Sequence, residues 1–211
     1  KTFIKIVLFS IALMYLYLFI KNQNFFDTSI RSVAFNVISI LTGTGYVNAE
    51  FDSWGSFPIT IFLALMFIGG CAGSTTCGIK IFRIQILYLF ILNQLKKIIY
   101  PKGVFLIKYE QNSVDDKFIA SIISFIYFYF VIFFLLAALL SLTGLDFVTS
   151  ISGAATSISN VGPGLGPIIG PNGDFSSLPD ISKWILTIGM ILGRLQLFAI
   201  LVLFLPSFWR N

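Results

Sequence analysis

Long apolar stretches alternate with shorter polar ones along this chain, and four of the apolar stretches approach the length of a membrane span. They cover residues 3–20, 54–70, 118–143 and 184–205. A bilayer core about 30 Å thick takes roughly 20 apolar residues in a helix, so each stretch predicts a helix that crosses a membrane. The first has no small-residue cleavage site after it, which favours a span over a signal peptide.

The chain between the first and second spans, and again between the third and fourth, is too polar to cross a membrane and too apolar for an ordinary loop. Each of these segments has an Asp, about three helical turns and then a glycine-rich turn. The pattern predicts short helices over residues 28–40 and 146–157 that enter the membrane without crossing it. Irregular backbone at that depth is tolerated only inside protein or beside a water-filled cavity. We therefore expect an all-α membrane protein made of two span, short helix, glycine loop and span repeats.

The composition agrees with a membrane protein. Hydrophobic residues form 57% of the 211 positions and charged residues 11%, and the mean hydropathy is +0.92. Because the chain starts with Lys1 and enters an apolar run at Phe3, it is expected to be cut from a longer one. Cys71 and Cys77, in a chain without histidine, indicate neither a disulfide framework nor a zinc site.

The basic residues predict the orientation of the chain in the membrane. Seven of the fourteen Lys and Arg residues lie between the two repeats, which places that connection in the cytoplasm and the glycine loops on the outer side. They flank apolar spans and do not form a stripe with interleaved aromatic residues, so no nucleic-acid partner is expected. The seven are Lys80, Arg83, Lys96, Lys97, Lys102, Lys108 and Lys117.

The outer side is predicted to be mildly acidic, with six acidic residues against three basic ones. A negative vestibule would concentrate cations at a pore mouth, although ordinary solvated loop charges explain each acid equally well. The acids are Asp27, Glu50, Asp52, Asp146, Asp174 and Asp180, and the bases are Lys21, Arg31 and Lys183.

The two glycine loops have the chemistry that a dehydrated cation needs. A ring of backbone carbonyls can replace the water around a monovalent cation, and glycine permits the unusual backbone angles that turn carbonyls to one side. "TGTGY" at residues 42–46 and "NVGPG" at residues 160–164 both meet this need. The helix before each loop would direct its partially negative C-terminal end at the ion. Nucleotide-binding loops are not indicated, because "GSTTCGIK" lacks the GK[ST] ending and "GPGLGP" has Pro167 in place of the last glycine.

Two features lie deeper in the predicted membrane. The apolar run from Phe57 to Lys97 would be about 60 Å long as one helix, so it must break, and the break is predicted at Gly69, Gly70 and Gly73, followed by Ser74, Thr75 and Thr76. A kink without any gating role is the alternative. Arg194 stands inside the last apolar run, where a charge is costly unless it has a partner or water, so a functional role is the default. Gly189 and Gly193 before it predict close helix packing.

Four stretches together resemble one transporter family. They are "LTGTGYVNAEFDSW", "FIGGCAGSTTCGIKIFR", "SNVGPGLGPIIGPNGDFSSLPDISKW" and "ILGRLQLFAILVLFLPSFW". In this order they are similar to the second half of a Trk-type potassium transporter, within the Trk/Ktr/HKT superfamily. The resemblance implies a potassium-channel-like pore of four repeats. Residues 1–98 would be the third repeat, residues 99–116 a cytoplasmic connection and residues 117–211 the fourth repeat.

The resemblance also implies roles for individual residues. Gly45 and Gly162 match the filter glycines, and K⁺ would bind the carbonyls of Thr44, Gly45, Asn160, Val161 and Gly162. The whole implied filter is Thr42, Gly43, Thr44, Gly45, Tyr46, Asn160, Val161, Gly162, Pro163 and Gly164. The implied gate is the intramembrane loop with Gly69, Gly70, Gly73, Ser74, Thr75 and Thr76, which Arg194 contacts from the pore. Cys77 and Gln196 depart from the family pattern, which usually has glycine and glutamate there.

The expected function is potassium uptake across the inner membrane of a bacterium, without enzymatic chemistry and with K⁺ as cargo and no covalent cofactor. The implied partners are the N-terminal half of the same transporter, a second copy in a homodimer, a cytosolic nucleotide-binding regulatory ring and the lipid bilayer. A sodium-permeating or cation-coupled relative and a non-conducting membrane scaffold are the alternatives at this stage, because the first two repeats bear on ion selectivity.

Overall fold

The framework of the molecule is helical. The structure is a computed structural model that describes residues 2–21, 30–103, 105–109, 112–195, 202 and 206–209. Within these ranges the named strands are one antiparallel pair of two residues each, with Lys108 opposite Ser113 and Tyr109 opposite Asn112. The elements are α1 (Thr2–Ile20), α2 (Ile30–Leu41), η1 (Phe51–Trp54), α3 (Ser56–Phe67), α4 (Ile81–Ile99), β1 (Lys108–Tyr109), β2 (Asn112–Ser113), α5 (Asp116–Leu142), α6 (Phe147–Ser159), α7 (Asp180–Arg194) and η2 (Pro206–Trp209).

Two of the described helices, α1 and α5, are long and apolar enough to cross a membrane. The helix predicted over residues 54–70 is shorter, because α3 ends at Phe67 and Ile68 is already extended. The last predicted span is seen as α7 up to Arg194, and its continuation over residues 196–201 and 203–205 lies outside the described residues. Among the described residues, therefore, only the first helix of each predicted repeat is long and apolar enough to be a clear membrane span.

Both short helices predicted before the glycine loops are present, as α2 and α6. The Asp146 carboxylate caps α6 by accepting a hydrogen bond from the Thr149 backbone N–H at 3.2 Å. Interaction with the Thr149 side chain, followed by backbone N–H groups of the first turn, holds the pKa of Asp146 below its ordinary value. Capping of this kind satisfies one of the free N–H groups at a helix start. Asp27, which stands before α2, lies outside the described residues.

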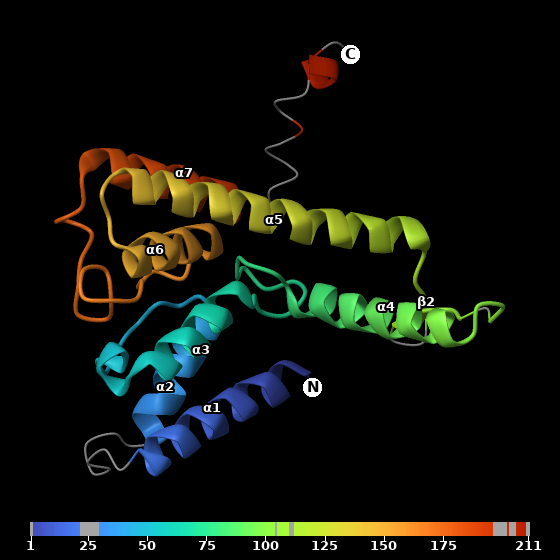
Figure 1. Cartoon of the computed structure of the whole chain (residues 1–211), viewed down its shortest axis with the longest axis horizontal. Helices are drawn as coiled ribbons and strands as arrows, with labels where there is room; N and C mark the ends of the chain where they lie inside the picture. The colour runs from blue at the N-terminus through green and yellow to red at the C-terminus, as the bar shows by residue number, and fades with distance from the viewer. Residues whose placement is uncertain are drawn as a thin grey trace.

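Helix α6 is the centre of the half of the chain that runs from α5 to α7. It packs against α5, α7 and α3, and its residues 152–159 are all buried (Figure 1). Small side chains on α6 allow the other helices to pack closely around it. Several of the hydroxyl groups on α6 have hydrogen-bond partners. Ser157 donates to the Ala154 carbonyl oxygen at 2.9 Å, and the Ser159 hydroxyl lies 2.7 Å from the Tyr129 hydroxyl on α5. A helix of small, internally bonded residues can thus be enclosed by larger helices.

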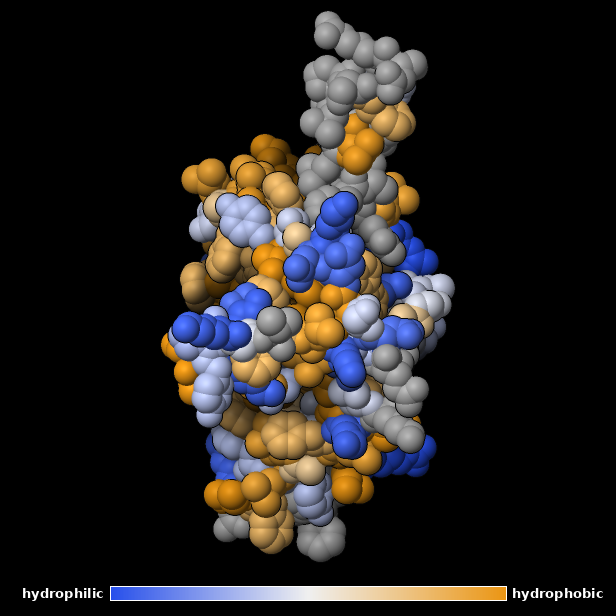
Figure 2. All heavy atoms as spheres, turned by 90° about the vertical axis from the view of Figure 1, so that its right-hand side faces the viewer, coloured by the Kyte–Doolittle hydropathy of each residue, from blue (hydrophilic) through white to orange (hydrophobic). Residues whose placement is uncertain are grey.

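The outer surface of the long helices is apolar. Leu8, Phe9 and Phe19 on α1 and Tyr127 and Phe134 on α5 each expose more than half of their surface. Figure 2 views the end of the molecule that carries the α4–α5 connection, where hydrophilic side chains gather between hydrophobic ones. Apolar exposure on this scale is typical of a surface that faces lipid or further protein.

Close contact between α6 and α7 depends on glycine. A Cβ atom at Gly193 would overlap the carbonyl oxygen of Ile158, and one at Gly189 would lie 2.7 Å from the Ser157 hydroxyl. The predicted packing role of these two glycines is therefore confirmed, with α6 as the partner helix.

We expect Gly193→Ala to destabilise the protein by about 1–3 kcal/mol, because the added methyl group pushes against a backbone carbonyl that cannot rotate away. Gly153→Ala is the matched control. A Cβ there would lie 3.4–3.5 Å from its neighbours, which is ordinary contact, and alanine favours a helix. Thermal unfolding of the two purified variants in detergent measures the difference. Equal midpoints would contradict the packing argument.

Candidate functional site: two glycine loops above an intramembrane loop

The glycine loop after α2 and the glycine loop after α6 touch each other. A Cβ atom at Gly45 would overlap the carbonyl oxygen of Val161 and would lie 3.3 Å from the Pro163 ring. A Cβ at Gly162 would lie 3.5 Å from the Gly45 Cα atom. The backbones of the two loops therefore pass at a distance that leaves no room for a side chain at position 45.

The loop after α2 folds back onto the end of its own helix. The backbone N–H groups of Thr44 and Gly45 both donate to the Ser39 carbonyl oxygen, at 2.9 and 3.4 Å. Gly43 and Gly45 have φ angles of 66° and 77°, a region that residues with side chains rarely adopt. The Thr42 hydroxyl donates to the Ile38 carbonyl oxygen at 2.7 Å, so this loop is tied to α2 over its first half.

The loop after α6 is held in a similar way. The Val161 N–H donates to the Thr156 carbonyl oxygen at 3.1 Å, and the Gly162 N–H donates to the Thr156 hydroxyl at 3.0 Å. Asn160 takes a left-handed conformation with φ of 51° at the end of the helix, and its side-chain amide donates to the Met190 carbonyl oxygen on α7 at 3.0 Å. Gly162 has φ of 116°.

These bonds turn the N–H groups of residues 42–45 and 160–162 into the helix ends and leave the carbonyl oxygens of the loops without a protein donor in the described part of the chain. No hydrogen bond within the described ranges has a carbonyl oxygen of residues 42–46 or 160–164 as its acceptor. Buried or half-buried carbonyls need a partner, and a dehydrated monovalent cation is one that several carbonyls can share. Because α2 and α6 both end at these loops, the negative ends of two helices also point to this place.

The predicted break in the long helix is a closed loop over residues 68–80. Its two ends are paired, since the Gly69 N–H donates to the Ile79 carbonyl oxygen and the Ile79 N–H donates to the Phe67 carbonyl oxygen, both at 2.9 Å. The tip of this loop reaches the glycine loops. A Cβ atom at Gly43 would lie 3.3 Å from the methyl group of Thr76. The intramembrane loop thus lies directly against the start of the loop after α2.

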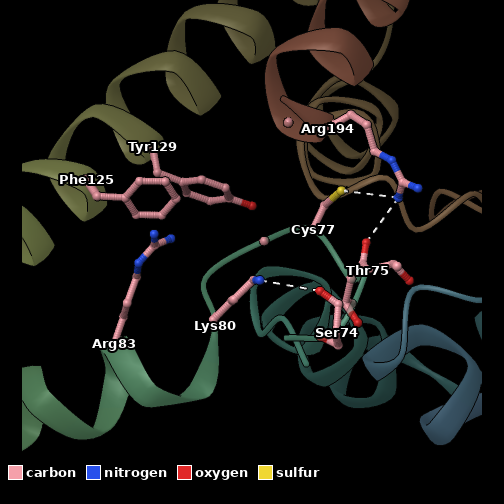
Figure 3. A pocket seen from close by; sticks show the side chains of 11 residues that line it. Ser74, Thr75, Cys77, Lys80, Arg83, Phe125, Tyr129 and Arg194 are labelled. Atoms are coloured by element: carbon pink, nitrogen blue, oxygen red, sulfur yellow. Dashed lines mark hydrogen bonds between the residues drawn. The ribbon is translucent and has the colours of Figure 1, made fainter. Parts of the chain in front are cut away.

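Arg194 contacts this intramembrane loop from the end of α7. Its Nη1 donates to the Thr75 carbonyl oxygen at 3.1 Å and lies 4.0 Å from the Cys77 Sγ (Figure 3). A charge in an apolar run was expected to have a partner, and the partner of Arg194 is a backbone carbonyl and not a carboxylate. Gln196, which follows it, lies outside the described residues.

Arg194 also lines a cavity of about 250 Å³ between the intramembrane loop, the start of α4 and α5. Lys80 donates to the Ser74 carbonyl oxygen at 3.4 Å across this cavity, and the Arg83 guanidinium lies 3.8 Å from the centre of the Phe125 ring (Figure 3). Three cationic side chains and no carboxylate are among its lining residues. The electrostatic potential here is positive, in contrast to the carbonyl-rich glycine loops.

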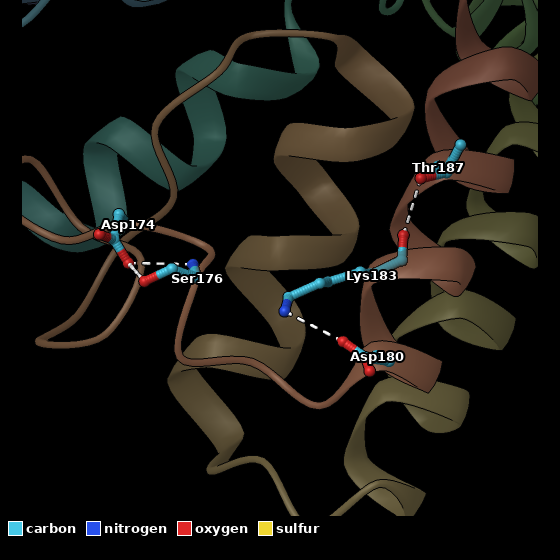
Figure 4. Close-up of polar contacts among 5 residues, drawn as sticks. All are labelled: Asp174, Ser176, Asp180, Lys183 and Thr187. Atoms are coloured by element: carbon cyan, nitrogen blue, oxygen red, sulfur yellow. Dashed lines mark hydrogen bonds and ion pairs between the residues drawn. The ribbon is translucent and has the colours of Figure 1, made fainter.

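The return path from the loop after α6 to α7 is stabilised by local contacts at the surface. Asp174 accepts a hydrogen bond from the Ser176 backbone N–H at 2.9 Å, and Lys183 pairs with Asp180 at 3.2 Å (Figure 4). The Asp180 side chain is 90% exposed, so this ion pair contributes little to stability. These acids are turn and helix-end residues, in line with the simpler explanation of the outer charges.

Asp52 is different from the other outer acids, and its contact was not predicted from the sequence. Its Oδ2 accepts a hydrogen bond from the Gly166 N–H at 3.0 Å, which joins η1 to the chain beyond the loop after α6. The "FDSW" turn is visible in the sequence, but no local pattern there indicates a partner 114 residues away.

Two glycine loops that meet at helix ends, together with long helices that expose apolar side chains, are typical of the class of membrane transport proteins. Comparison with known proteins agrees, since residues 3–211 match the TrkH family, described as cation transport proteins. The chain belongs to the TrkH family.

The relatives of this chain are potassium uptake proteins. It is 46% identical over 184 residues to the Trk system potassium uptake protein TrkI of Halomonas elongata, covering 87% of this chain and 37% of that protein. It is 32% identical over 211 residues to TrkH of Vibrio parahaemolyticus, covering 99% of this chain and 42% of that protein. The crystal structure of the latter, described as a potassium transporter, superposes with a TM-score of 0.88 over 99% of this chain and 44% of that one. The chain therefore spans about two fifths of the length of these relatives.

Loss of the Arg194 contact should loosen the intramembrane loop. In Arg194→Ala, amide hydrogen exchange over residues 70–78 is expected to rise several-fold, because the Thr75 carbonyl loses a charged donor. Lys183→Ala, which removes another cation from the same helix, is the control and should leave exchange in this loop unchanged. Mass spectrometry of peptides from a complete transporter that carries this sequence measures both, and identical exchange in the two variants would refute a role for the contact.

Proposed function

We propose that this chain supplies the third and fourth pore repeats of a bacterial potassium uptake transporter, with residues 1–98 and 117–211 as the repeats and residues 99–116 as a cytoplasmic connection. The observation that carries the proposal is the meeting of the two glycine loops, with N–H groups bonded into helix ends and carbonyl oxygens left free. The names of the relatives support potassium as the ion. Because these names specify potassium, sodium permeation is the weaker of the two proposals for this chain.

In this proposal the loops over residues 42–46 and 160–164 form half of a selectivity filter. Carbonyl oxygens of Thr44, Gly45, Asn160, Val161 and Gly162 replace part of the hydration shell of K⁺. Because carbonyls carry no net charge, the ion is held strongly enough to enter and weakly enough to leave. The ion is cargo, and no bond is made or broken in the protein.

The intramembrane loop over residues 68–80 is proposed to be the gate. Its glycines permit movement, and its hydroxyls satisfy backbone groups, as Ser74 does by donating to the Cys71 carbonyl oxygen at 2.7 Å. Arg194 holds the loop through the Thr75 carbonyl oxygen and adds a positive charge below the filter. Both effects oppose the passage of a cation, so conduction requires the loop and Arg194 to separate.

The remaining pore repeats are proposed to come from an N-terminal half of the same transporter, since two repeats cannot enclose a four-sided pore. A homodimer and a cytosolic nucleotide-binding regulatory ring are further proposed partners. The basic connection between α3 and α5, with Lys96 and Lys97 at the end of α4, is on the side that such a ring would approach. The location is the bacterial inner membrane.

Replacement of a filter glycine tests the ion path. In a complete transporter that carries this sequence, Gly162→Ser should reduce the K⁺ over Na⁺ flux ratio about tenfold or more, because a side chain at φ of 116° displaces the neighbouring carbonyls. Gly153→Ala, on the buried helix before the loop, should keep the ratio. Flux of both ions into proteoliposomes gives the ratio. Unchanged uptake of K⁺ and Na⁺ by the Gly162 variant would sink the filter assignment.

Replacement of Arg194 tests the gate. Arg194→Ala should raise K⁺ flux through an otherwise intact transporter several-fold, because both a barrier charge and a contact that restrains the loop are lost. Arg194→Lys retains the charge without the forked donor, so it should give an intermediate flux. Flux in Arg194→Ala equal to that of the unaltered protein would rule out the barrier role.

A further inference from the structure

The Asp52 carboxylate joins the two halves of this chain on the outer side of the glycine loops. Asp52 lies in η1, six residues after the loop that follows α2, and its Oδ2 accepts the Gly166 N–H at 3.0 Å. Gly166 lies two residues after the loop that follows α6. A bond between these positions fixes the outer end of one glycine loop relative to the outer end of the other.

The segment that Asp52 holds has three anchors, and two of them belong to its own half of the chain. The Gly164 N–H donates to the Ile169 carbonyl oxygen at 2.8 Å. The Ser152 hydroxyl on α6 bonds both backbone groups of Leu165, at 3.0 and 3.1 Å. The bond from Asp52 is the third anchor and the one that comes from the other half.

The chain around Gly166 is shaped to admit this carboxylate. A Cβ atom at Gly170 would overlap Asp52 Oδ2, so the backbone approaches the carboxylate as closely as a glycine allows. A second link runs beside it, from the Asn172 side-chain amide to the Glu50 carboxylate, but both of those residues are more open to solvent. Asp52 therefore forms the inner link of the pair.

Asp52 occupies a half-buried site where loss of water disfavours the ionised form of its carboxyl group. Its Oδ1 is buried without a hydrogen-bond partner among the described residues, and burial raises the pKa of Asp52 from 3.8 to about 6, although the bond from the Gly166 N–H acts the other way. A raised pKa means that Asp52 contributes most to stability at low pH, and this contribution is lost as the pH rises through about 6. An ionised carboxylate that costs stability at neutral pH calls for a reason other than folding.

Few other charges face this carboxylate. Glu50 lies on the same turn, and Lys21 reaches the far end of η1, where its Nζ donates to the Trp54 carbonyl oxygen at 3.4 Å. Residues 162–173, helix α3 and helix α6 contain no titratable side chain. Protonation at this site as the pH falls through about 6 is therefore a change at Asp52.

The geometry points to Asp52 as a positioning residue that keeps the fourth-repeat loop in register with the third-repeat loop and thereby sets how sharply the filter discriminates between ions. This inference rests on the proposed filter function. The charge-assisted bond to Gly166 is stronger than a bond to a neutral oxygen, so loss of the charge loosens the loop without removing any carbonyl ligand.

The test compares Asp52→Asn and Asp52→Ala in a complete transporter that carries this sequence, with K⁺ and Na⁺ flux into proteoliposomes as the readout. Asn keeps an acceptor of the same shape, so the K⁺ over Na⁺ ratio at pH 7.5 should fall about three- to tenfold with Asn and further with Ala. In the unaltered protein the ratio should fall as the external pH drops through about 6. In Asp52→Asn it should not change over this pH range.

Glu50→Gln is the matched control, because it removes one acid from the same rim and leaves the bond to Gly166 in place. A shift in Glu50→Gln as large as that in Asp52→Asn would overturn the positioning role in favour of rim charge alone. A normal ratio and a normal pH profile in Asp52→Asn would also overturn it.

Hydrogen exchange over residues 164–170 gives a readout that does not depend on flux. Exchange should be faster in Asp52→Asn than in Glu50→Gln, and equal rates would overturn the inference. Failure of the filter proposal itself is recognised separately, since in that case Gly162→Ser retains full discrimination.

Discussion

The arrangement of this chain depends on where the backbone N–H groups of two short loops find their acceptors. Thr44 and Gly45 donate to Ser39, and Val161 and Gly162 donate to Thr156, so each loop is bonded to the helix from which it emerges. A backbone that places its donors inside has to place its carbonyl oxygens outside. Buried backbone groups need partners, so this division of polar groups satisfies the N–H donors and leaves a surface of carbonyl oxygens that suits a cation.

Close packing around α6 makes this division possible. A helix with larger side chains could not lie between α5, α7 and α3, and Gly193 allows α7 to approach the last turn of α6 to within backbone contact. The same approach brings Met190 to Asn160, whose amide then fixes the first residue of the loop. Packing of small residues thus determines the position of the loop, and the loop's hydrogen bonds determine its conformation.

Local features of this molecule follow from the sequence, and long-range ones do not. The helices before the glycine loops and a break of the long helix near Gly69 were both predictable, because periodicity and glycine act over a few positions. The helix over residues 54–70 was predicted too long, since hydropathy does not register that Ile68 is extended and paired with Ile79. The sequence indicated that an arginine inside an apolar run needs a partner, but only the fold shows that the partner is the Thr75 carbonyl. The bond from Asp52 to Gly166 depends on how two halves pack, and no spacing along the chain encodes it.

The contact between Thr76 and Gly43 has a mechanical consequence. The tip of the intramembrane loop packs against the glycine loop after α2 from below, so the two loops are in direct van der Waals contact. A movement that withdraws the tip would leave the first turn of that glycine loop without its lower neighbour, and a distortion of the glycine loop would press on the tip. Opening of the intramembrane loop and ion discrimination by the glycine loops would then be coupled through this contact. With the roles proposed above for the two loops, an ion that shifts the glycine loop would also shift the tip of the intramembrane loop, without any signal from the cytoplasm.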